Sequence, residues 1–352
     1  MKVCLLGDTH IGARNDNQHF HTYFQRFYDE VFFPYLRENN ITHVIQLGDL
    51  FDRRKYINFQ SLKLGRQYLF DRLNTECTTW ALVGNHDTYY KNTNEVNSLD
   101  LLLNGYTNIH VVNEPVELTF EDKKFLLVPW ICPDNEKQCL DAITTTDASV
   151  VIGHFEITGF EMYRGAVCDE GLDISVFRRL PAVLSGHFHH KSSNKNIHYL
   201  GTPYEITWSD YADVKGFHIY DTDTEELTFI RNPFVMFHKI LYDDTDKNME
   251  QCTNIDVHSY KGCIVKLIVR AKNNPAWFDV VVDKLEKAGV VDIQVVEDHF
   301  HLDLEADEDI VNEAEDTLTI LSKYIDQVQM TGDRQRLDTL MRNLYYEALN
   351  TE

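Results

Sequence analysis

Short apolar runs that end in polar, glycine-marked turns recur from residue 2 to about residue 232. They predict strands at residues 2–7, 42–47, 79–83, 125–130, 149–152 and 182–184. Two longer segments between the first three runs, residues 20–36 and 59–73, carry apolar residues at helical spacing. Because buried strands alternate with helices, this part of the chain predicts a layered α/β domain.

Two later pairs of apolar runs surround short polar turns. They are residues 116–120 with 124–128, and residues 216–221 with 227–231. Short, turn-rich connections of this kind join antiparallel strands, so each pair predicts a hairpin.

The pattern changes near Pro233. A strand at 262–269 precedes a helix that Pro275 opens and Gly289 closes, and another strand follows at 291–296. Apolar stripes then predict two C-terminal helices, the second of which either docks on a partner or packs against the first. We therefore divide the chain into a main domain at 1–235, a small α/β domain at 236–305 and helices at 306–352.

Composition and charge restrict the function of this fold. Of the 352 residues, 43 % are apolar and 25 % are charged, which is typical of globular proteins. The formal net charge of −23 argues against a protein that holds nucleic acid by bulk attraction to phosphates. No apolar run approaches the ~20 residues that span a bilayer. The seven cysteines form no C-x-x-C pair. We therefore expect reduced thiols, no membrane segment and a cytoplasmic location.

Five polar clusters follow predicted strands, and each begins with glycine. They are Gly7-Asp8-Thr9-His10, Gly48-Asp49-Leu50-Phe51-Asp52, Gly84-Asn85-His86-Asp87, Gly153-His154-Phe155-Glu156 and Gly186-His187-Phe188-His189. Glycine permits a sharp strand exit and a close approach of the backbone. We expect the clusters to gather at the carboxyl ends of the strands, where open α/β sheets place their sites.

The clusters contain carboxylate, amide and imidazole donors: Asp8, His10, Asp49, Asn85, His154, His187 and His189. This mixture, without thiolate, suits Mn²⁺, Fe²⁺ or Zn²⁺ better than Ca²⁺. Seven donors are too many for one open catalytic ion. They suit two ions ~3.5–4 Å apart that share a bridging carboxylate.

The series D-x-H, G-D, G-N-H-D, G-H and G-H-x-H resembles the calcineurin-like metallophosphoesterases. It is most similar to the nuclease subunits, including those of T4-type phages, that act with a coiled-coil ATPase in double-strand-break repair. The resemblance implies a layered β-sandwich flanked by helices, with a small α/β capping domain and C-terminal helices that dock on the ATPase. It implies a two-metal DNA exonuclease or endonuclease that hydrolyses phosphodiester bonds at DNA ends in recombination, replication and repair.

The same resemblance assigns the site residues and the cofactor. One ion is held by Asp8, His10 and His189, the other by Asn85, His154 and His187, and Asp49 bridges them. His86 acts as the general acid for the leaving oxygen. The implied cofactor is a pair of divalent ions, Mn²⁺ as first choice with Mg²⁺ as the alternative.

At position 52 this chain carries aspartate, whereas many relatives carry histidine three residues after the bridging aspartate. We expect Asp52 to accept a hydrogen bond from His86 and to raise the pKa of that histidine. The alternative is that Asp52 caps the following helix.

Basic residues lie close to two of the clusters. Arg53, Arg54 and Lys55 follow Asp52, and Lys91 follows the third cluster. They either contact DNA phosphates at the mouth of the site or are ordinary solvated charges.

Three functions remain open. The first is the DNA nuclease, working on DNA with the ATPase and as a homodimer, for which residues 59–73 or 95–103 are candidate interface helices. The second is a phosphoprotein phosphatase or small-molecule phosphodiesterase on the same scaffold. The third is a scaffold with a degenerate metal site, against which the complete donor set argues.

Overall fold

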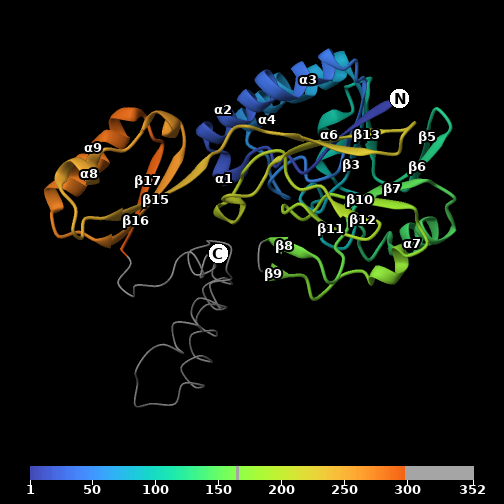
Figure 1. The fold of residues 1–352 in the computed structure, drawn as a ribbon. Coiled ribbons are helices and arrows are strands. Elements are labelled where there is room, and N and C mark those ends of the chain that lie inside the picture. The colour runs from blue at the N-terminus through green and yellow to red at the C-terminus, as the bar shows by residue number, and fades with distance from the viewer. Residues whose placement is uncertain (164–165, 298–352) are drawn as a thin grey trace.

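Two six-stranded sheets stack face to face in the computed structural model, which describes residues 1–163 and 166–297 (Figure 1). The first sheet has the order β14-β13-β1-β2-β3-β4. Its strands are β1 Lys2–Leu6, β2 His43–Gln46, β3 Thr78–Leu82, β4 Ile109–Val112, β13 Gly216–Asp221 and β14 Leu227–Arg231. The second has the order β11-β12-β10-β7-β6-β5. Its strands are β5 Val116–Phe120, β6 Lys123–Val128, β7 Val150–Gly153, β10 Ala182–Ser185, β11 Ser192–Asn194 and β12 Ile197–Tyr199.

The alternation of side chains along each strand builds three apolar layers. In β1, Val3 and Leu5 enter the layer between the two sheets, whereas Cys4 and Leu6 face the helices on the outside. In β7, Val150 faces the layer between the sheets and Val151 faces the opposite way. Because both faces of these strands are buried, they read in the sequence as continuous apolar runs.

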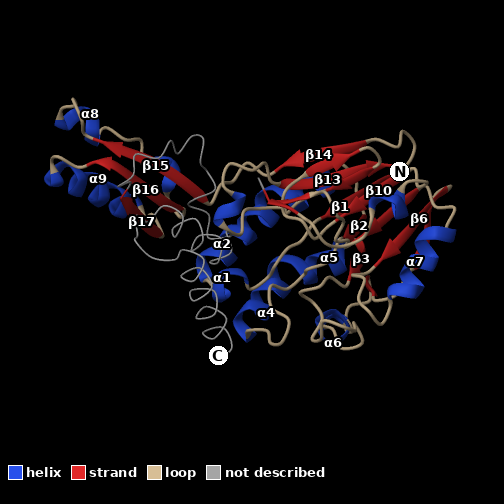
Figure 2. Ribbon diagram, turned by 90° about the horizontal axis from the view of Figure 1, so that it is seen from below, coloured by secondary structure: helices blue, strands red, loops and turns tan. Residues whose placement is uncertain are grey.

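Helices cover the outer face of each sheet, as Figures 1 and 2 show. Over the first sheet lie α2 Gln18–Phe27, a π-helical segment Tyr28–Phe32, α3 Phe33–Glu38, α4 Phe59–Gly65, a second π-helical segment Arg66–Phe70, α5 Asp71–Glu76 and α6 Ser98–Leu103. Over the second sheet lie α7 Glu136–Thr145 and the 3₁₀ turn Ile174–Phe177. The hairpin of β8 Glu161–Tyr163 and β9 Ala166–Val167 forms a separate ribbon.

A third, parallel sheet of β15 Phe237–Asp243, β16 Ile264–Ala271 and β17 Asp292–Glu297 follows. It carries α8 Met249–Thr253 and α9 Pro275–Ala288, and Gly289 ends α9 with a positive φ of 83°. The sheet has its own apolar cluster around Val265, Leu267 and Leu285. Phe237 instead joins the large cluster beneath α2, so the start of β15 ties the third sheet to the first.

The predicted layered α/β sandwich, both hairpins and the Pro275-to-Gly289 helix are confirmed. The sequence analysis missed β4, β8, β9, β11, β12 and β15; all but β15 span four residues or fewer. The two C-terminal helices, and residues 298–305 of the small domain, lie outside the described residues, and the domain boundaries stay predictions. Among the described residues, none of the helices combines the length and apolar character needed to cross a membrane.

Candidate metal centre

The five polar clusters meet where the two sheets adjoin, because each follows the carboxyl end of a parallel strand. Loops after β1, β2 and β3 of the first sheet carry Asp8, His10, Asp49, Asn85 and His86. Loops after β7 and β10 of the second sheet carry His154, His187 and His189. Asp8, His10, Asp49 and His154 are almost completely buried. The structure thus brings together donors separated by up to 181 residues, between positions 8 and 189.

The glycines in these clusters leave space that a side chain would fill. A Cβ on Gly48 would lie 2.4 Å from Nδ1 of His154, and one on Gly84 would lie 2.1 Å from the backbone nitrogen of Asp49. A Cβ on Gly186 would lie 2.5 Å from Oδ1 of Asp8. The close backbone approach expected from the sequence is confirmed at these three positions, since any larger residue would displace a donor.

Three donors adopt a backbone conformation that non-glycine residues rarely take. The φ angles of His10, Asp49 and His187 are 42°, 49° and 83°. Such conformations cost about 1–3 kcal/mol each and persist where the surrounding structure enforces them. Here the enforcing contacts include hydrogen bonds from the backbone N–H groups of Thr9 and His10 to the carbonyl of Asp49.

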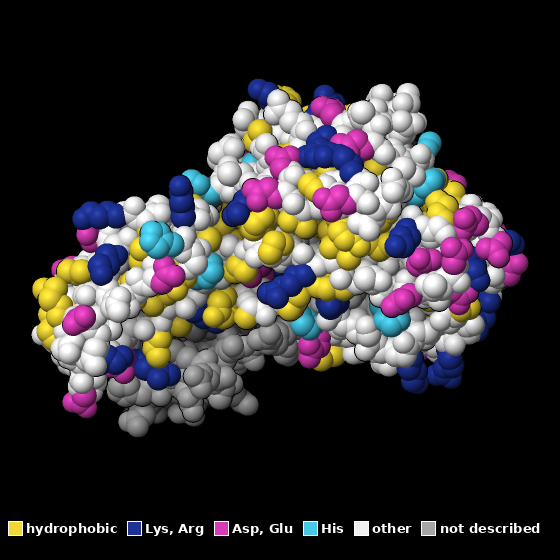
Figure 3. All heavy atoms as spheres, turned by 45° about the horizontal axis from the view of Figure 1, so that its top comes forward, with side chains coloured by type: hydrophobic (Ala, Val, Ile, Leu, Met, Phe, Trp, Pro, Cys, Tyr) yellow, Lys and Arg dark blue, Asp and Glu magenta, His cyan; other side chains and the backbone are white. Residues whose placement is uncertain are grey.

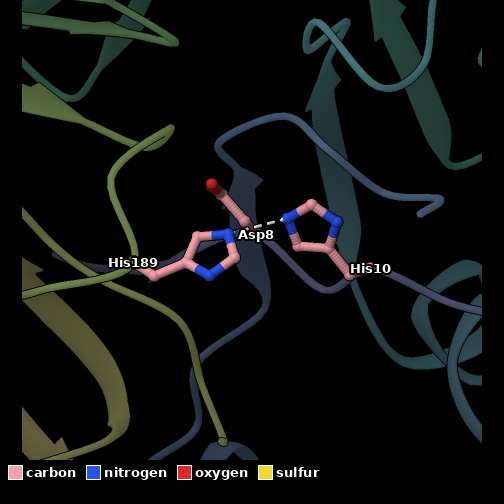
Figure 4. A group of neighbouring side chains, drawn as sticks. All are labelled: Asp8, His10 and His189. Carbon is pink, nitrogen blue, oxygen red and sulfur yellow. Dashed lines mark hydrogen bonds between the residues drawn. The ribbon is translucent and has the colours of Figure 1, made fainter. Parts of the chain in front are cut away.

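Asp8, His10 and His189 form one group, whose candidate ligand atoms lie within 4.8 Å of one another. Figure 4 shows Asp8 and His10 on the loop after β1, with His189 facing them from the loop after β10. The Nε2 atoms of His10 and His189 are 3.0 Å apart. This group contains the residues that the family resemblance assigned to one ion.

Asp49, His154 and His187 form the second group. Oδ1 of Asn85 lies 2.8 Å from Nε2 of His154 and 3.0 Å from Nδ1 of His187, so the amide belongs to it. Oδ2 of Asp49 lies 3.3 Å from Nε2 of His154 and 3.8 Å from Nε2 of His10. Asp49 therefore stands between the groups, as a bridging carboxylate would.

The residues present fit a pair of divalent cations. Oδ1 of Asp8 is buried without a hydrogen-bond partner among the described residues, which would be costly unless a cation satisfied it. Nδ1 of His154 donates to the carbonyl of Leu47 at 2.9 Å, which leaves Nε2 as the atom that can bind a metal. Imidazole, amide and carboxylate donors suit Mn²⁺, Fe²⁺ or Zn²⁺.

The pKa values of the metal-free groups show how the negative charge is balanced. Burial lowers the pKa of His10, but nearby Asp52, Asp49 and Asp8 outweigh it and raise the value to about 9. The pKa of His154 is about 9 for the same reason, with Asp49 as the main opposing charge. The carboxylates of each group thus favour a positive charge at this position, which a bound cation would supply.

The other histidine of each group stays neutral. Burial, followed by the charge on His154, lowers the pKa of His187 to about 3. Burial, followed by the charge on His10, lowers that of His189 to about 3. A neutral imidazole is the form that binds metal, so these two side chains are preset as ligands.

The expected hydrogen bond between the side chains of Asp52 and His86 is wrong. Nδ1 of His86 lies 2.6 Å from the backbone carbonyl of Asp52, while the Asp52 carboxylate lies 3.3 Å from Nδ1 of His10. Burial lowers the pKa of His86, rather than raising it as expected. The helix-cap alternative is also wrong, because Asn58 caps α4. The Asp52 carboxylate instead lies at ion-pair distance from His10, a position from which carboxylates often orient metal-binding histidines.

Two supporting groups were not assigned a role from the sequence. Asp87, whose part was left open, accepts hydrogen bonds from the backbone N–H groups of Gly84, Leu50 and Phe51. It therefore clamps the loop after β2 to the loop after β3. Its G-N-H-D position marked it as a candidate, but the sequence could not show which loop it binds.

Lys215 is the second supporting group. Its Nζ donates to the carbonyl of His189 at 2.8 Å, to Asp210 at 2.7 Å and to Asp213 at 3.0 Å. Only 4 % of Lys215 is exposed. The charge pairs hold the backbone of the last donor against the sandwich. In the sequence, alternating charges in a turn are typical of a solvated surface, so no signal marked them.

The basic residues at the mouth occupy different environments. Arg53 bridges to Asp16 and Asn15, and the guanidinium of Arg54 lies 5.4 Å from the ring centre of Trp130. Lys55 and Lys91 are exposed. On the face shown in Figure 3, Lys and Arg side chains are scattered among Asp and Glu instead of forming one basic patch.

The sandwich and its donor set define a metallophosphoesterase. The family model for calcineurin-like phosphoesterases matches residues 1–191, and the chain belongs to this family. Exonuclease subunit 1 of Enterobacteria phage T4 is 31 % identical over 351 residues, which cover 99 % of both chains.

Two shorter matches agree with this assignment. Putative phosphoesterase 078R of Invertebrate iridescent virus 3 is 29 % identical over 210 residues, 57 % of each chain. A subunit of the nuclease SbcCD from Staphylococcus epidermidis is 23 % identical over 262 residues, 64 % of this chain and 67 % of that protein.

Proposed function

We propose that this protein is a DNA nuclease that uses two divalent ions, with Mn²⁺ as first choice and Mg²⁺ as the alternative. It hydrolyses phosphodiester bonds at DNA ends in recombination, replication and repair. The observation that carries the proposal is the match to a protein named as an exonuclease subunit, which extends over 99 % of both chains and so continues beyond the phosphoesterase segment.

The donors take the roles that their grouping suggests. Asp8, His10 and His189 hold one ion, Asn85, His154 and His187 hold the other, and Asp49 bridges. Divalent ions held there would polarise the phosphoryl oxygen and lower the pKa of the attacking water. Asp52 keeps Nδ1 of His10 oriented so that Nε2 faces the ion.

His86 supplies the proton for the departing oxygen. A carbonyl only accepts, so Nδ1 of His86 must carry the proton in its contact with the Asp52 carbonyl. Nε2 is then the atom available to the phosphate. Burial holds the pKa of His86 below its usual value. A neighbouring phosphodiester anion opposes that effect, because negative charge favours the imidazolium.

DNA contacts are proposed for Arg53, Arg54, Lys55 and Lys91. A net charge of −23 leaves little general attraction for duplex DNA, so we assign most of the DNA grip to a coiled-coil ATPase partner. The relatives named as nuclease or exonuclease subunits support a multi-subunit assembly. Its place of action would be the cytoplasm, the host cytoplasm if a phage encodes it.

A homodimer is proposed through an apolar surface formed by α4, α6 and the loops that precede them. Phe59 is 89 % exposed and Leu101 66 %, with Tyr56 and Val96 beside the same groove of about 260 Å³. Large exposed apolar groups of this kind mark interaction sites.

If a second copy covers them, Leu101→Asp yields a monomer in sedimentation velocity where the wild type is a dimer. A monomeric wild type would contradict the proposal.

The function is tested with purified protein, linear duplex DNA and Mn²⁺ or Mg²⁺, with and without the ATPase, using His86→Ala as the catalytic control. Metal-dependent DNA cleavage that His86→Ala reduces would support the nuclease. The second candidate is a phosphoprotein phosphatase or small-molecule phosphodiesterase. Efficient hydrolysis of a phosphopeptide or cyclic nucleotide, without DNA cleavage under any of these conditions, would favour it instead.

A further inference from the structure

A cavity of about 300 Å³ adjoins the candidate metal centre on the side of His154. Its lining includes Trp130, Ile131, Glu136, Glu156 and Leu172. We propose that this cavity binds an unpaired nucleobase next to the phosphodiester bond that is cleaved. The inference rests on the proposed nuclease function and adds to it a contact with the base.

The lining suits the neutral, planar part of a nucleotide better than its phosphate. Trp130, Ile131 and Leu172 offer apolar surface to the faces of a ring. Glu136 and Glu156 are exposed and can accept hydrogen bonds from the amino groups of adenine, cytosine or guanine. None of the described lining residues is Lys or Arg, so the carboxylates would repel a phosphate placed among them.

Trp130 is fixed relative to the metal centre and is free of core packing. Its backbone N–H donates to the carbonyl of Val83 at 2.8 Å, directly before the G-N-H-D cluster. Its own carbonyl accepts from Nδ2 of Asn135 at 3.0 Å. The side chain belongs to none of the four apolar clusters of the described residues. The backbone of Trp130 is therefore anchored beside the loop that carries Asn85 and His86.

Arg54 lines the neighbouring groove beside α4 and α6 rather than this cavity, but its side chain reaches Trp130 and can hold the phosphate of the same nucleotide. Its guanidinium lies 5.4 Å from the ring centre of Trp130, and its Nη1 is buried without a hydrogen-bond partner among the described residues. An unpaired buried donor is costly unless a ligand satisfies it. One nucleotide would meet both residues: its phosphate oxygen would accept a hydrogen bond from Arg54, and its base would stack beside Trp130.

The test removes the base and the ring separately and together. The substrates are DNA ends with a short single-stranded overhang, in which a tetrahydrofuran abasic residue replaces the nucleotide on one side or the other of the cleaved bond. The full-length wild type, Trp130→Ala and Trp130→Phe are compared with Mn²⁺. In the wild type, the abasic residue at one of the two positions should lower kcat/KM about tenfold or more.

The variants then identify the partner of that base. Trp130→Ala should cleave intact DNA about tenfold more slowly and lose little more at the abasic position, while Trp130→Phe recovers most of the rate. Leu241→Ala, which shortens a side chain that is 51 % exposed on β15, is the control for a surface truncation. It should respond to the abasic residue as the wild type does.

The outcomes separate this inference from the proposed function. If the wild type does not cleave DNA either alone or with the ATPase, both fail. If it cleaves DNA but tolerates the abasic residue at both positions within twofold, the base site alone is wrong. The same holds if the losses from Trp130→Ala and the abasic residue multiply, because the ring and the base would then act independently.

Discussion

The two sheets of the sandwich contribute different chemistry to one centre. All the carboxylates and the amide come from the first sheet, whereas the second sheet supplies only imidazoles: His154, His187 and His189. The N–H of His187 donates to Asp8 across the junction at 2.9 Å. Neither sheet alone offers the full set, so the centre depends on how the sheets pack.

The largest effect should follow from Asp49→Asn. This substitution removes the negative charge that stands between the two groups and keeps the size and shape of the side chain. We expect kcat/KM for DNA to fall by about 10³-fold, because a neutral amide with one oxygen cannot bridge two cations as a carboxylate does. Bound metal, measured by elemental analysis, should fall with it. Asp122→Asn on an exposed turn is the control. Full activity in Asp49→Asn would disprove the bridging role.

A smaller loss should follow from His187→Gln in the second sheet. One ligand of one group is lost, so we expect about 10²-fold lower turnover with partial retention of metal. His198→Gln on β12 of the same sheet is the matched control. If the two variants behave alike, the second sheet does not supply the ligands, and the contrast between the sheets is wrong.

Lys215→Met tests whether Lys215 positions His189, the last candidate ligand from the second sheet. The carbonyl of His189 loses its Nζ contact, so we expect about 10- to 100-fold weaker metal binding. Stability should also fall by about 3 kcal/mol, because the buried carboxylate of Asp210 loses its counter-ion, whereas Asp213 keeps its contact with His190.

Excess metal distinguishes positioning from unfolding in this variant. A positioning role predicts that a high Mn²⁺ concentration restores turnover. The double variant Lys215→Met with Asp210→Asn should regain stability without regaining metal affinity. Turnover that stays low at saturating metal would contradict the assignment.

The double variant Arg53→Ala with Arg54→Ala removes two positive charges from the loop after β2 and leaves the metal-binding side chains unchanged. We expect DNA cleavage to fall about tenfold relative to hydrolysis of bis(p-nitrophenyl) phosphate, since charge-assisted contacts to the DNA backbone are lost. Lys63→Ala with Arg66→Ala, both exposed, is the charge-matched control. Equal losses on both substrates would contradict a role in holding DNA.

The contrast between the sheets also explains what the sequence could predict. Glycine before a polar residue at each strand exit marked the side chains that the structure brings together, because parallel strands bring their carboxyl ends to one edge. The partner of Asp52 was not predictable, since the turn of the loop after β2 decides whether its carboxylate meets His10 or His86. Lys215 was missed because its partners are set by packing rather than by spacing.

The smallest effect on the metal centre concerns the attachment of the third sheet, which belongs to neither half of the centre. Oε2 of Glu205 accepts from the N–H groups of Met236 and Phe237 at 2.6 and 2.9 Å. Burial nevertheless raises the pKa of Glu205 from 4.5 to about 7. The fold therefore favours the protonated form.

That preference gives a defined pH dependence. The stabilisation from proton uptake is fully present below pH 4.5 and is lost as pH rises through about 7. Glu205→Gln cannot ionise, and its amide oxygen can accept both N–H bonds. The unfolding free energy of wild type minus variant should fall by up to about 3 kcal/mol between pH 5 and pH 8. Chemical denaturation at both pH values measures it, and metal binding should not change. A difference that is the same at both pH values would mean that Glu205 is ionised throughout, and that the two N–H donors outweigh its burial.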